Sequence, residues 1–513
     1  MVRSHVILLF AVAALTASSA TAQIALTPIG MYAAGGNMRA EIAAYDPATK
    51  RVFSSNFDQA RLDVLDISNP AAPVLAFTII PGGKPNSVAV RGGIVAVAVE
   101  NAIKTDPGQV KLYDTNGILL SSVNVGALPD MLTFTPNDRR LLVANEGEPN
   151  SYGMAGSVDP EGSVSIIDMT GGAANVTQAD VTTATFDSAI PTTDAGSIRV
   201  YGPGASLAQD LEPEYIAVSH DSKTAWVTLQ ENNALAVLDI EAGQFTRLIG
   251  LGFKDHNLAA NKLDPSDQDN PSPPPAGSIR INNWPVLGMY QPDGIDSYKV
   301  GGVTYLVMAN EGDARDYPGF NEEIRVSSGS YPLDPIVFPN ASDLKMNKNL
   351  GRLTVTRATG DADGDGDYDQ ILVPGGRSFS IRTEAGALLF DSGDDFEQQT
   401  ALDFPDLFNS NGTAATFDTR SDNKGPEPEG VVIGKVFGRT YAFIGLERTG
   451  GVMVYDVSNP FWPAFVQYVN NSPEDISPEG LLFIKEDDSP NGRPLLITSN
   501  EFTGTTRIFQ IDK

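Results

Sequence analysis

The segment Asp361 to Asp369 reads DADGDGDYD and carries a carboxylate at every second residue. In a tight loop, carboxylates at this spacing turn inward on one small cation, and a glycine at the sixth position, here Gly366, permits the sharp turn. This is the most specific chemical signal in the chain. It predicts a calcium ion bound by Asp361, Asp363, Asp365, Asp367 and Asp369.

Two features distinguish this segment from a helix-loop-helix calcium site. Position twelve is Leu372, where such sites carry a bidentate glutamate. The flanking stretches GRLTVT and ILVPGG are typical of strands and not of helices. The alternative interpretation is therefore an acidic hairpin tip in water. A second acidic insertion, with Asp264, Asp267 and Asp269, is a candidate for a weaker oxygen site.

Acidic and amide side chains also recur at the two ends of apolar runs. The residues that open a run, as in EPEY, EPEG and SPEG, are called openers here. They are Glu41, Asn86, Asp130, Glu214, Asp293, Glu429 and Glu479. The closing residues, which end the next apolar run, are Asn56, Asn101, Glu146, Glu231, Glu311, Glu447 and Glu501. If both sets meet at one rim, their carboxylates form a candidate cation site.

Crowded carboxylates repel one another, so a bound cation or a paired arginine is expected to offset the repulsion. The candidate arginines are Arg315 in EGDARDY, Arg448 in LERTGG and Arg377 in GGRSF. They either pair with carboxylates for structural reasons or bind an anion, with Arg315 and Arg448 as the candidate anion-binding residues. Each single carboxylate is equally well explained as a solvated strand end, because Glu-Gly and Pro-Glu are ordinary turn sequences.

Several kinds of catalytic chemistry are excluded by what the chain lacks. It has no cysteine, which excludes thiol catalysis, thiolate zinc sites and disulfides. After the first 22 residues only His220 and His256 remain, too few for a three-histidine site. The chain contains no nucleophile elbow, P-loop or HExxH motif. An enzyme of this sequence would work through metal-bound water and carboxylates.

The elements that carry these residues are strands. Apolar alternation at period two recurs in SVSIID, YIAVS, TAWVTL, LAVLDI and GVMVYDV, and no long stretch has a helical period. Each repeat contains a polar opening phrase, a strand, a turn, a second strand ending in Asn or Glu, and a third strand. The tetrapeptide ANEG occurs at 144–147 and 309–312, at two second-strand ends. Antiparallel pairing places each opener beside the end of the next strand, so both sets should share one face.

Seven such repeats are present. The first openers, Glu41, Asn86 and Asp130, are spaced by 45 and 44 residues, the length of one β-propeller blade. We therefore predict an all-β chain that folds as a single seven-bladed β-propeller with inserted loops. The segment 24–33 is expected to be a strand that closes the ring beside the last repeat. The predicted boundaries are residues 1–22 for a signal peptide and 23–513 for the propeller.

The first 22 residues have the pattern of a secretory signal peptide, with Arg3, an apolar stretch at 6–15 and the cleavage sequence Ala20-Thr21-Ala22. No later stretch reaches the ~18 apolar residues that span a bilayer. The net charge of -29, from 64 acidic and 35 basic residues, disfavours nucleic acid and favours cations and basic partners. Export without cysteine predicts a secreted or periplasmic bacterial protein.

Several longer motifs resemble the choice-of-anchor I family. They are ANEGDARDY, GDADGDGDYDQILVPGGRSFSI, EPEGVVIG, ERTGGVMVYDVSNP, INNWPVLGMYQPDG and SPEGLLFI. The family comprises secreted bacterial propellers related to the mesenchyme-specific cell-surface glycoproteins of biomineralising animals. The resemblance spans nearly all of the chain after the signal peptide and implies a surface or secreted protein associated with calcium. The family often ends in a sorting tail, and none follows Lys513, so free export is expected.

Two functions of different classes remain open. The first is a calcium-binding extracellular propeller without enzymatic activity that binds a mineral, a polymer or a surface partner. We favour it because no nucleophile or base stands out. The second is a calcium-dependent phosphoesterase, since some relatives in the resembling family are labelled alkaline phosphatase or phytase-like. In that case the rim carboxylates would hold metals and Arg315 or Arg448 would hold phosphate.

Overall fold

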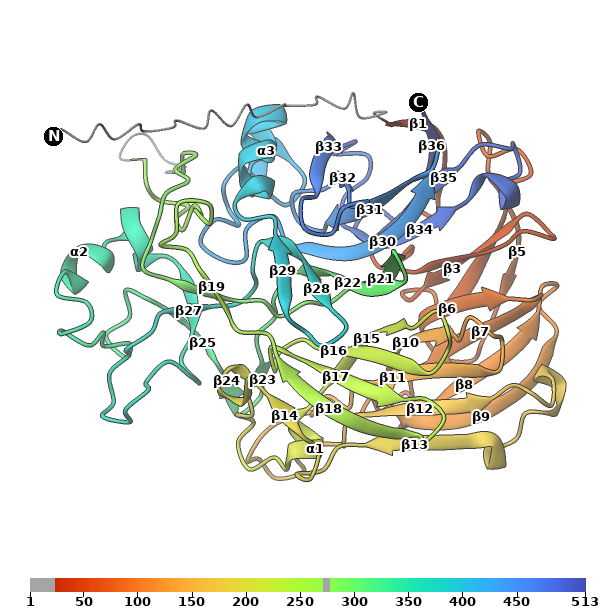
Figure 1. Ribbon diagram of the computed structural model, residues 1–513, viewed down its shortest axis with the longest axis horizontal. Coiled ribbons are helices and arrows are strands. Elements are labelled where there is room, and N and C mark those ends of the chain that lie inside the picture. The colour runs from red at the N-terminus through yellow and green to blue at the C-terminus, as the bar shows by residue number, and fades with distance from the viewer. Residues whose placement is uncertain (1–23, 271–276) are drawn as a thin grey trace, which may run out of the picture.

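The computed structural model describes residues 24–270 and 277–513. The predicted signal peptide, residues 1–22, lies outside the described residues. Strands form most of the regular structure, which confirms the predicted all-β class (Figure 1). Among the described residues, seven sheets contain four or five strands each, and the remaining sheets have two or three.

The first three large sheets are built from strands that follow one another along the chain and pair antiparallel. The first sheet contains β2 (Ala43–Asp46), β3 (Arg51–Asn56), β4 (Arg61–Asp66) and β5 (Val74–Ile79). The second contains β6 (Pro85–Arg91), β7 (Ile94–Val99), β8 (Pro107–Asp114) and β9 (Leu119–Ala127). The third contains β10 (Pro129–Phe134), β11 (Arg140–Asn145), β12 (Ser163–Asp168) and β13 (Val181–Thr185).

The next three large sheets repeat this order. The fourth has an additional short strand, and in the fifth an insertion separates the second strand from the third. The fourth contains β15 (Pro213–Val218), β16 (Thr224–Leu229), β17 (Ala234–Asp239) and β18 (Gln244–Gly250), and the short β14 (Thr192–Thr193) pairs parallel with β18. The fifth contains β21 (Ile295–Val300), β22 (Val303–Asn310), β28 (Ser378–Thr383) and β29 (Leu388–Asp391). The sixth contains β30 (Pro428–Val436), β31 (Arg439–Leu446), β32 (Val452–Asp456) and β33 (Ala464–Val469).

The seventh large sheet joins the two ends of the described chain. It contains β34 (Pro478–Ile484), β35 (Leu495–Asn500), β36 (Thr505–Asp512) and β1 (Ala25–Ala33). β1 pairs antiparallel with β36, from Ala25 opposite Asp512 to Ala33 opposite Thr505. The two strands lie beside each other at the top of Figure 1, as the sequence predicted for segment 24–33.

The large sheets stack face against face. The first strands of successive sheets contact one another in the order β2, β6, β10, β15, β21, β30 and β34, and β34 also contacts β2. A buried apolar cluster lies between each successive pair, and another, which includes Val52 and Ile497, lies between the first and seventh sheets. Because both faces of a sheet are covered, central strands such as β7 (IVAVAV) are continuously apolar.

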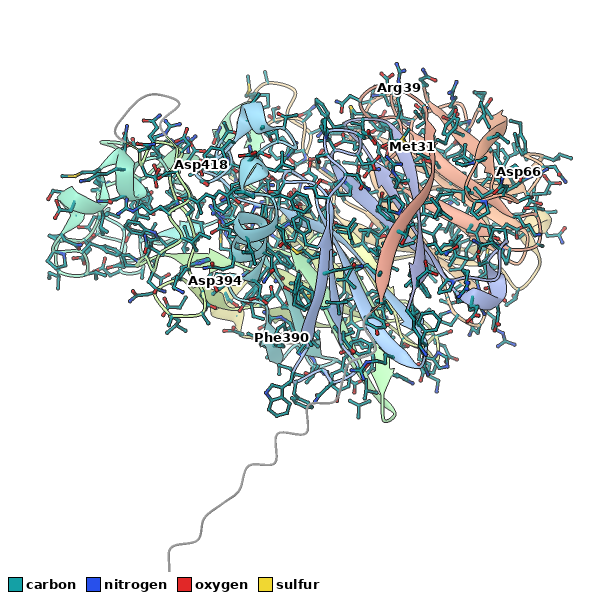
Figure 2. All side chains as sticks on the ribbon, turned by 90° about the horizontal axis from the view of Figure 1, so that it is seen from above. Met31, Arg39, Asp66, Phe390, Asp394 and Asp418 are labelled. Carbon is teal, nitrogen blue, oxygen red and sulfur yellow. The ribbon has the colours of Figure 1, made fainter. Side chains whose placement is uncertain are left out.

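Insertions in and around the fifth sheet form a separate lobe, at the left of Figure 1. Its own apolar core includes Leu263, Trp284, Tyr331 and Val355. The short strands of these insertions are β19 (Phe253–Asp255), β20 (Leu287–Met289), β23 (Asp316–Tyr317), β24 (Phe320–Asn321), β25 (Glu323–Arg325), β26 (Thr354–Thr356) and β27 (Leu372–Val373). Of these, β23 and β24 pack through Tyr317 and Phe320 against Tyr152 and not into the lobe core. In the view of Figure 2, Asp418 lies on the side of this lobe, far from Asp66 of the first sheet.

Helices are few and short in the described part of the chain. The α-helices are α1 (Leu207–Asp210), α2 (Ala341–Leu344) and α3 (Asp395–Asp403). Single turns of other helix types are η1 (Ala173–Asn175), η2 (Gln178–Asp180), η3 (Ala195–Ser197), η4 (Asn347–Gly351), η5 (Pro405–Leu407), η6 (Ala414–Thr416) and η7 (Glu486–Asp488). None of these described helices is long and apolar enough to cross a membrane.

Candidate functional site

The opening carboxylates are positioned by irregular starts of the first strands. Five of these strands begin with proline, and the acidic or amide opener is the second residue of each. Proline suits this place because the first residue of a strand need not donate a ladder hydrogen bond. In all five strands the pairing register shifts directly after the proline. Such a bulge turns the opener side chain away from the regular alternation.

The closing glutamates follow the second strands by one or two residues, and backbone hydrogen bonds join three of them to residues that precede the openers of the same sheet. The backbone N–H of Glu146 donates to the carbonyl of Leu128, which immediately precedes the β10 proline, at 2.9 Å. Glu447 and Glu501 make the equivalent bonds to Glu427 and Ser477, each at 2.7 Å. The two sets of residues therefore meet at the same end of each of these sheets, as the antiparallel pairing predicted.

The repeated tetrapeptide ANEG has a structural reason at each residue. Asn145 is fully buried and donates to Ser163 and Ser165 of the third strand, and Asn310 donates to Ser378 in the same way. The glycine has a positive φ, +92° at Gly312, which a residue with a side chain rarely adopts. A Cβ on Gly312 would also lie 2.1 Å from a backbone nitrogen. Of the motif's residues, it is thus the glutamate that lies at the rim, although Glu146 and Glu311 are themselves largely buried.

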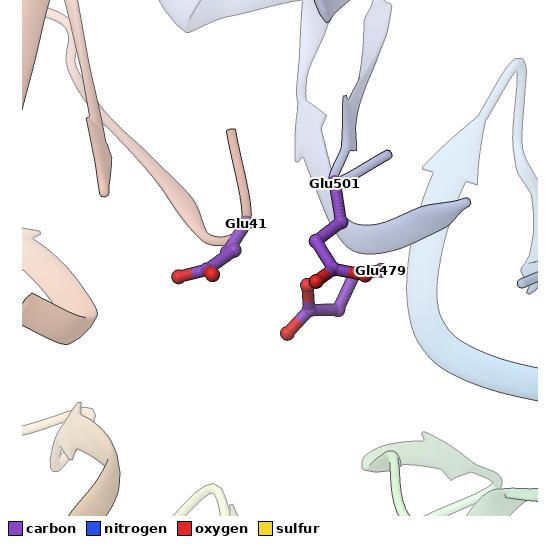
Figure 3. Close-up of side chains that lie close together, drawn as sticks. All are labelled: Glu41, Glu479 and Glu501. Carbon is purple, nitrogen blue, oxygen red and sulfur yellow. The ribbon is translucent and has the colours of Figure 1, made fainter. Parts of the chain in front are cut away.

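Three groups of rim carboxylates place one oxygen per residue within 4.8 Å of the others. They are Glu41 with Glu479 and Glu501, Asp293 with Glu311 and Glu429, and Glu311 with Glu427 and Glu447. Figure 3 shows the first group, which brings together residues from the first and seventh sheets. All of these residues except Glu427 were predicted from the sequence. Glu427 is the first glutamate of the EPEG phrase, whereas the predicted residue is the second, Glu429.

The openers of five different sheets also line one small central cavity. Its volume is about 40 Å³, and its polar lining comprises Asn86, Asp130, Asp293, Glu429 and Glu479. One oxygen of Glu429 and the amide oxygen of Asn86 are buried there without a hydrogen-bond partner. Four acidic side chains and one amide therefore converge on this cavity, and where the carboxyl groups are ionised their charge would attract a cation.

The rim carboxyl groups hold their protons more tightly than usual. Burial, with the charges of Glu501 and Asp130, raises the pKa of Glu41 to about 9. Burial also raises the pKa of Asp130 to about 7, and those of Glu231 and Glu447 to about 8. The pKa values of Glu146, Glu214, Asp293, Glu429 and Glu479 lie well above the ordinary range for the same reason and through mutual repulsion. A bound cation would replace these protons.

Basic side chains neutralise the rim at the fifth and sixth sheets. Lys424 Nζ lies 2.6 Å from Glu311 and 3.2 Å from Glu427. Arg448 lies 3.0 Å from Glu447, and Arg420 lies 2.5 Å from Glu427. Burial raises the pKa of Glu427, but Lys424 and Arg420 outweigh it, so this pKa is below its ordinary value. Lys424 and Arg420 could not be predicted from the sequence pattern because they lie in a loop without periodicity.

The candidate arginines divide into two kinds. Arg448 does reach the rim, and its side chain remains 40% exposed. Arg315 is instead fully buried and pairs with Asp210 and Glu212, each at 3.1 Å, which favours the structural alternative over anion binding. Arg377 has its own partner, because it pairs with Glu397 of α3 at 2.5 Å.

The aspartate loop divides into two groups of carboxylates. Asp361, Asp363 and Asp365 place oxygens within 4.8 Å of one another. Asp367 and Asp369 instead gather with Asp334, which comes from another part of the lobe. The flanking stretches contain the predicted strands β26 and β27, although these pair with β25 and β20 and not with each other. Asp334 could not be predicted from the loop motif, since it lies 27 residues before the loop.

The acidic residues of the second insertion, and the histidine His256 near them, have partners within the protein. Asp267 pairs with Arg352 at 2.8 Å, whereas Asp264 and Asp269 accept hydrogen bonds from backbone N–H groups. His256 is 1% exposed, and its Nδ1 lies 2.7 Å from the carbonyl of Asn261. Burial and the nearby Lys254 hold the pKa of His256 well below its ordinary value, so the ring is neutral.

Stacked four-stranded antiparallel sheets whose strand ends converge on a polar centre define an all-β protein of the β-propeller type. Within that class, the chain belongs to the choice-of-anchor I family, whose domain profile matches residues 41–460. The family resemblance of the sequence motifs is thereby confirmed.

Two animal proteins are similar in sequence. Gigasin-3a of Magallana gigas is 28% identical over 184 residues, which cover 32% of this chain and 64% of that protein. The mesenchyme-specific cell surface glycoprotein of Strongylocentrotus purpuratus is 26% identical over 286 residues, which cover 49% of this chain and 36% of that protein. The matches therefore span less than two thirds of either relative.

Solved structures with a similar arrangement have little sequence in common with this chain. Hydrazine synthase of Kuenenia stuttgartiensis has 13% identity and a TM-score of 0.48, over 92% of this chain and 96% of that one. The β-propeller domain of Cps50 (Swd1) from Myceliophteria thermophila has 10% identity and a TM-score of 0.45, over 94% of this chain and 99% of that one.

Proposed function

We propose that this protein is an extracellular or surface-associated β-propeller that binds calcium through carboxylates at the mouth of its channel. Membership in the choice-of-anchor I family supports this location, as does similarity to a protein named as a cell surface glycoprotein. The signal-peptide pattern of residues 1–22 supports export in a bacterium. Expected ligands are cations and a phosphate-containing or polymeric extracellular partner.

We infer further that the seven large sheets are seven blades of one ring. The continuous series of contacts between first strands, from β2 through β34 and back to β2, supports this inference. So does the apolar cluster shared by the first and seventh sheets. In such a ring, β1 closes the structure by completing the last blade, and the openers line the central channel.

The observation that carries the calcium proposal is the group of Glu41, Glu479 and Glu501. Their oxygens lie within 4.8 Å of one another, about twice the 2.3–2.6 Å length of a calcium–oxygen bond, so one ion reaches all three. Glu41 is only 7% exposed, whereas Glu479 and Glu501 are half-buried. No side-chain hydrogen bond or ion pair to the Glu41 carboxylate is found among the described residues. A calcium ion would offset the mutual repulsion of these three carboxylates.

A second calcium site is proposed at the aspartate loop, on Asp361, Asp363, Asp365, Asp367 and Asp369. The alternating carboxylates and the positive φ of +99° at Gly366 support the predicted loop geometry. The backbone N–H groups of Gly364 and Gly366 donate to Asp361, at 2.7 and 3.0 Å, which folds the loop around this residue. The approach of Asp334 supplies a carboxylate from outside the loop, where position twelve has a leucine.

Calcium titration of the protein spanning residues 23–513 tests the proposal. After dialysis against a chelator, isothermal titration should give separable sites, one of which disappears in the Glu41→Gln, Glu501→Gln double variant. The matched control is Glu384→Gln, which removes an exposed carboxylate outside the rim. Calcium binding that is identical in the double variant and the control would refute the rim site.

The same preparations distinguish binding from catalysis. Hydrolysis of a phosphate ester that requires calcium and is lost in the double variant would show the phosphoesterase function instead. The absence of hydrolysis, with calcium binding retained, is the result expected for a binding protein. Arg448 is the arginine placed to hold a phosphate in the first case, since Arg315 is enclosed by its own carboxylates.

A further inference from the structure

Two cavities adjoin at the end of the fourth and fifth sheets that is opposite the rim. β21 starts just after the rim residue Asp293 and ends at Val300, so residues near Val300 lie at the far end. Lys299 of β21 is the cross-strand partner of Thr304 in β22. These two residues line both a cavity of about 480 Å³ and one of about 320 Å³. The two cavities therefore share a wall, and each has the size of a small-molecule site.

The larger cavity has a polar lining of mixed charge. Three carboxylates and two basic side chains contribute to it, namely Asp221, Asp239, Glu384, Arg247 and Lys299. Among the described residues, no ion pair engages Glu384, Arg247 or Lys299, so these charged groups are not already neutralised by the chain. Carboxylates accept hydrogen bonds from hydroxyl groups, whereas ammonium and guanidinium groups donate to them. The lining therefore suits an uncharged ligand with many hydroxyl groups.

Two largely buried residues beside these cavities have hydroxyl groups without a partner in the described parts of the chain. Thr304 is 7% exposed and lines both cavities, and its hydroxyl makes no hydrogen bond there. Tyr298 lines the smaller cavity and is also 7% exposed, and its hydroxyl is buried without a partner. A buried polar group without a hydrogen bond is unfavourable. A ligand hydroxyl within reach of Thr304 would supply the missing partner at the shared wall.

Aromatic rings lead from the smaller cavity to the surface. The ring centroids of Tyr298 and Tyr305 lie 5.7 Å apart, and Phe461 meets Tyr305 edge to face at 6.4 Å. Trp462 comes next, with its ring centroid 6.2 Å from that of Phe461. Phe461 and Trp462 are 48% and 77% exposed. This exposed aromatic pair therefore extends the site beyond the polar cavities.

The aromatic pair is not required by the turn that carries it. The turn SNPFWP joins β32 to β33, and the turn SNPAAP joins β4 to β5 in the first sheet. In both turns the asparagine side chain accepts a hydrogen bond from the backbone two residues later, at 3.1 Å from Phe461 and 3.2 Å from Ala71. Its carbonyl accepts one from the following residue, at 3.2 Å from Trp462 and 3.0 Å from Ala72. Because Ala-Ala forms the same turn, the exposed Trp462 side chain has no structural role in it.

We propose that the two cavities and the aromatic pair form a binding site for a neutral polysaccharide. A sugar ring has hydroxyl groups around its edge and C–H groups on its faces. The hydroxyl groups bond to the charged lining and to Thr304, whereas a C–H face packs on the Trp462 ring. A polymer suits the site, since the aromatic pair continues beyond the cavities. The proposal shares only the extracellular location with the function proposed above and does not depend on the calcium sites.

Other ligand classes fit the same residues less well. A phosphate group would meet the carboxylates of Asp221, Asp239 and Glu384. A metal ion would meet the positive charges of Arg247 and Lys299. A lipid bilayer would take up the aromatic pair, but it would then cover a hollow lined by charged groups, which is unfavourable in an apolar phase. A membrane surface is therefore the alternative outcome of the test.

Affinity electrophoresis of the protein spanning residues 23–513 tests the proposal. Native gels contain one of four neutral polymers, which are dextran, laminarin, xyloglucan and galactomannan, or the acidic polymer polygalacturonate. At least one neutral polymer should retard the protein in the presence of chelator, and polygalacturonate should not. Trp462→Ala should raise the apparent Kd roughly tenfold, as expected for loss of one aromatic contact. Thr304→Val, which keeps the side-chain shape and removes the hydroxyl, should raise it about threefold or more.

The equivalent turn of the first sheet provides a matched control. The double variant Ala71→Phe, Ala72→Trp places the same aromatic pair away from the cavities and should leave retardation unchanged. Stronger retardation of this variant, or equal retardation of Trp462→Ala and the unmodified protein, would overturn the proposal. So would the absence of retardation by all four neutral polymers. Retention on phosphatidylglycerol vesicles that Trp462→Ala abolishes, without retardation by any polymer, would assign a membrane surface instead.

Two further measurements separate this site from folding defects and from the calcium proposal. Trp462→Ala restores the alanine that the first sheet has at the equivalent position, so its thermal unfolding should match that of the unmodified protein. Calcium titration of Trp462→Ala should also be unchanged, because the turn lies at the opposite end of the sheets from the rim. Failure of polysaccharide binding would therefore leave the calcium proposal standing.

Discussion

The Lys424 ammonium lies 2.6 Å from a carboxylate oxygen of Glu311, although 113 positions separate the two residues. Glu311 ends a strand of the fifth sheet, whereas Lys424 belongs to the loop that leads into the sixth. The same ammonium contacts Glu427 at 3.2 Å, and its side chain is 12% exposed. One part of the acidic rim is thus neutralised by the chain itself, whereas among the described residues no ion pair reaches Glu41.

Replacement of Lys424 by Met should strongly destabilise the protein. The change leaves Glu311 and Glu427 buried without their shared ammonium, and breaking a buried pair in this way costs about 3–5 kcal/mol. Urea unfolding in the presence of chelator measures the loss. The control is Lys435→Met on the exposed side of β30, which should change the free energy of unfolding by less than about 0.5 kcal/mol. Equal effects of the two changes would contradict the structural role given to Lys424.

The stability of the calcium-free protein should fall as pH rises. Burial and neighbouring charges raise the Glu41 pKa to about 9 in the folded protein, from an ordinary value of 4.5. The folded state therefore binds this proton more tightly than the unfolded state does. The resulting stabilisation is complete below pH 4.5 and is lost as pH rises through 9.

Melting temperature measured from pH 5.5 to 9 in chelator tests this dependence. Glu41→Gln should show a smaller fall than the unmodified protein, because its amide does not titrate. Saturating calcium should also reduce the fall, since a bound cation takes the place of the proton. A pH profile that is the same with and without Glu41 would show that this carboxyl does not titrate as described.

Removal of residues 24–33 should destabilise the fold, because β36 would lose its antiparallel partner. The loss of the buried Ile24 and Leu26 side chains and of the strand pairing should lower the melting temperature by roughly 5–10 °C. A point variant gives a sharper comparison. Leu26→Asp should reproduce most of the effect, whereas Thr27→Asp, at an exposed position of the same strand, should not. Similar melting temperatures for these two variants would argue against the packing of β1.

The aspartate loop should lose one calcium ion when Asp361 and Asp363 are both replaced by Asn. Calorimetric titration should then give a stoichiometry lower by one, with the rim site unaffected. Asp334→Asn tests whether Asp334 is a ligand of this same calcium site or lies outside it. If Asp334 completes the same site, this variant should weaken that one binding event by about tenfold or more, the size expected for loss of one ligand. No binding of calcium at millimolar concentration by the unmodified protein would refute the loop site.

Most of the strand order was predictable from the sequence. The alternation of apolar residues and the recurring opener and closer placed the two carboxylate sets at the same strand ends, where Glu146, Glu447 and Glu501 are found. These features are local, because pairing between consecutive strands needs only a turn and a matching pattern. The ANEG motif was recognisable for the same reason, since its buried Asn145 contacts residues only about 20 positions away.

The sequence by itself therefore determined the all-β class, the repeated strands and, except for Glu427, the glutamates that gather at the strand ends. Only the tertiary structure decided which of those glutamates are neutralised. Lys424, Arg420 and Asp334 lie in insertions whose residues follow no period, so no pattern indicates where they go. Their positions depend on the folding of the inserted lobe against the sheets. Electrostatic contacts have no sequence periodicity, and residues far apart in the chain become partners only when the chain has folded.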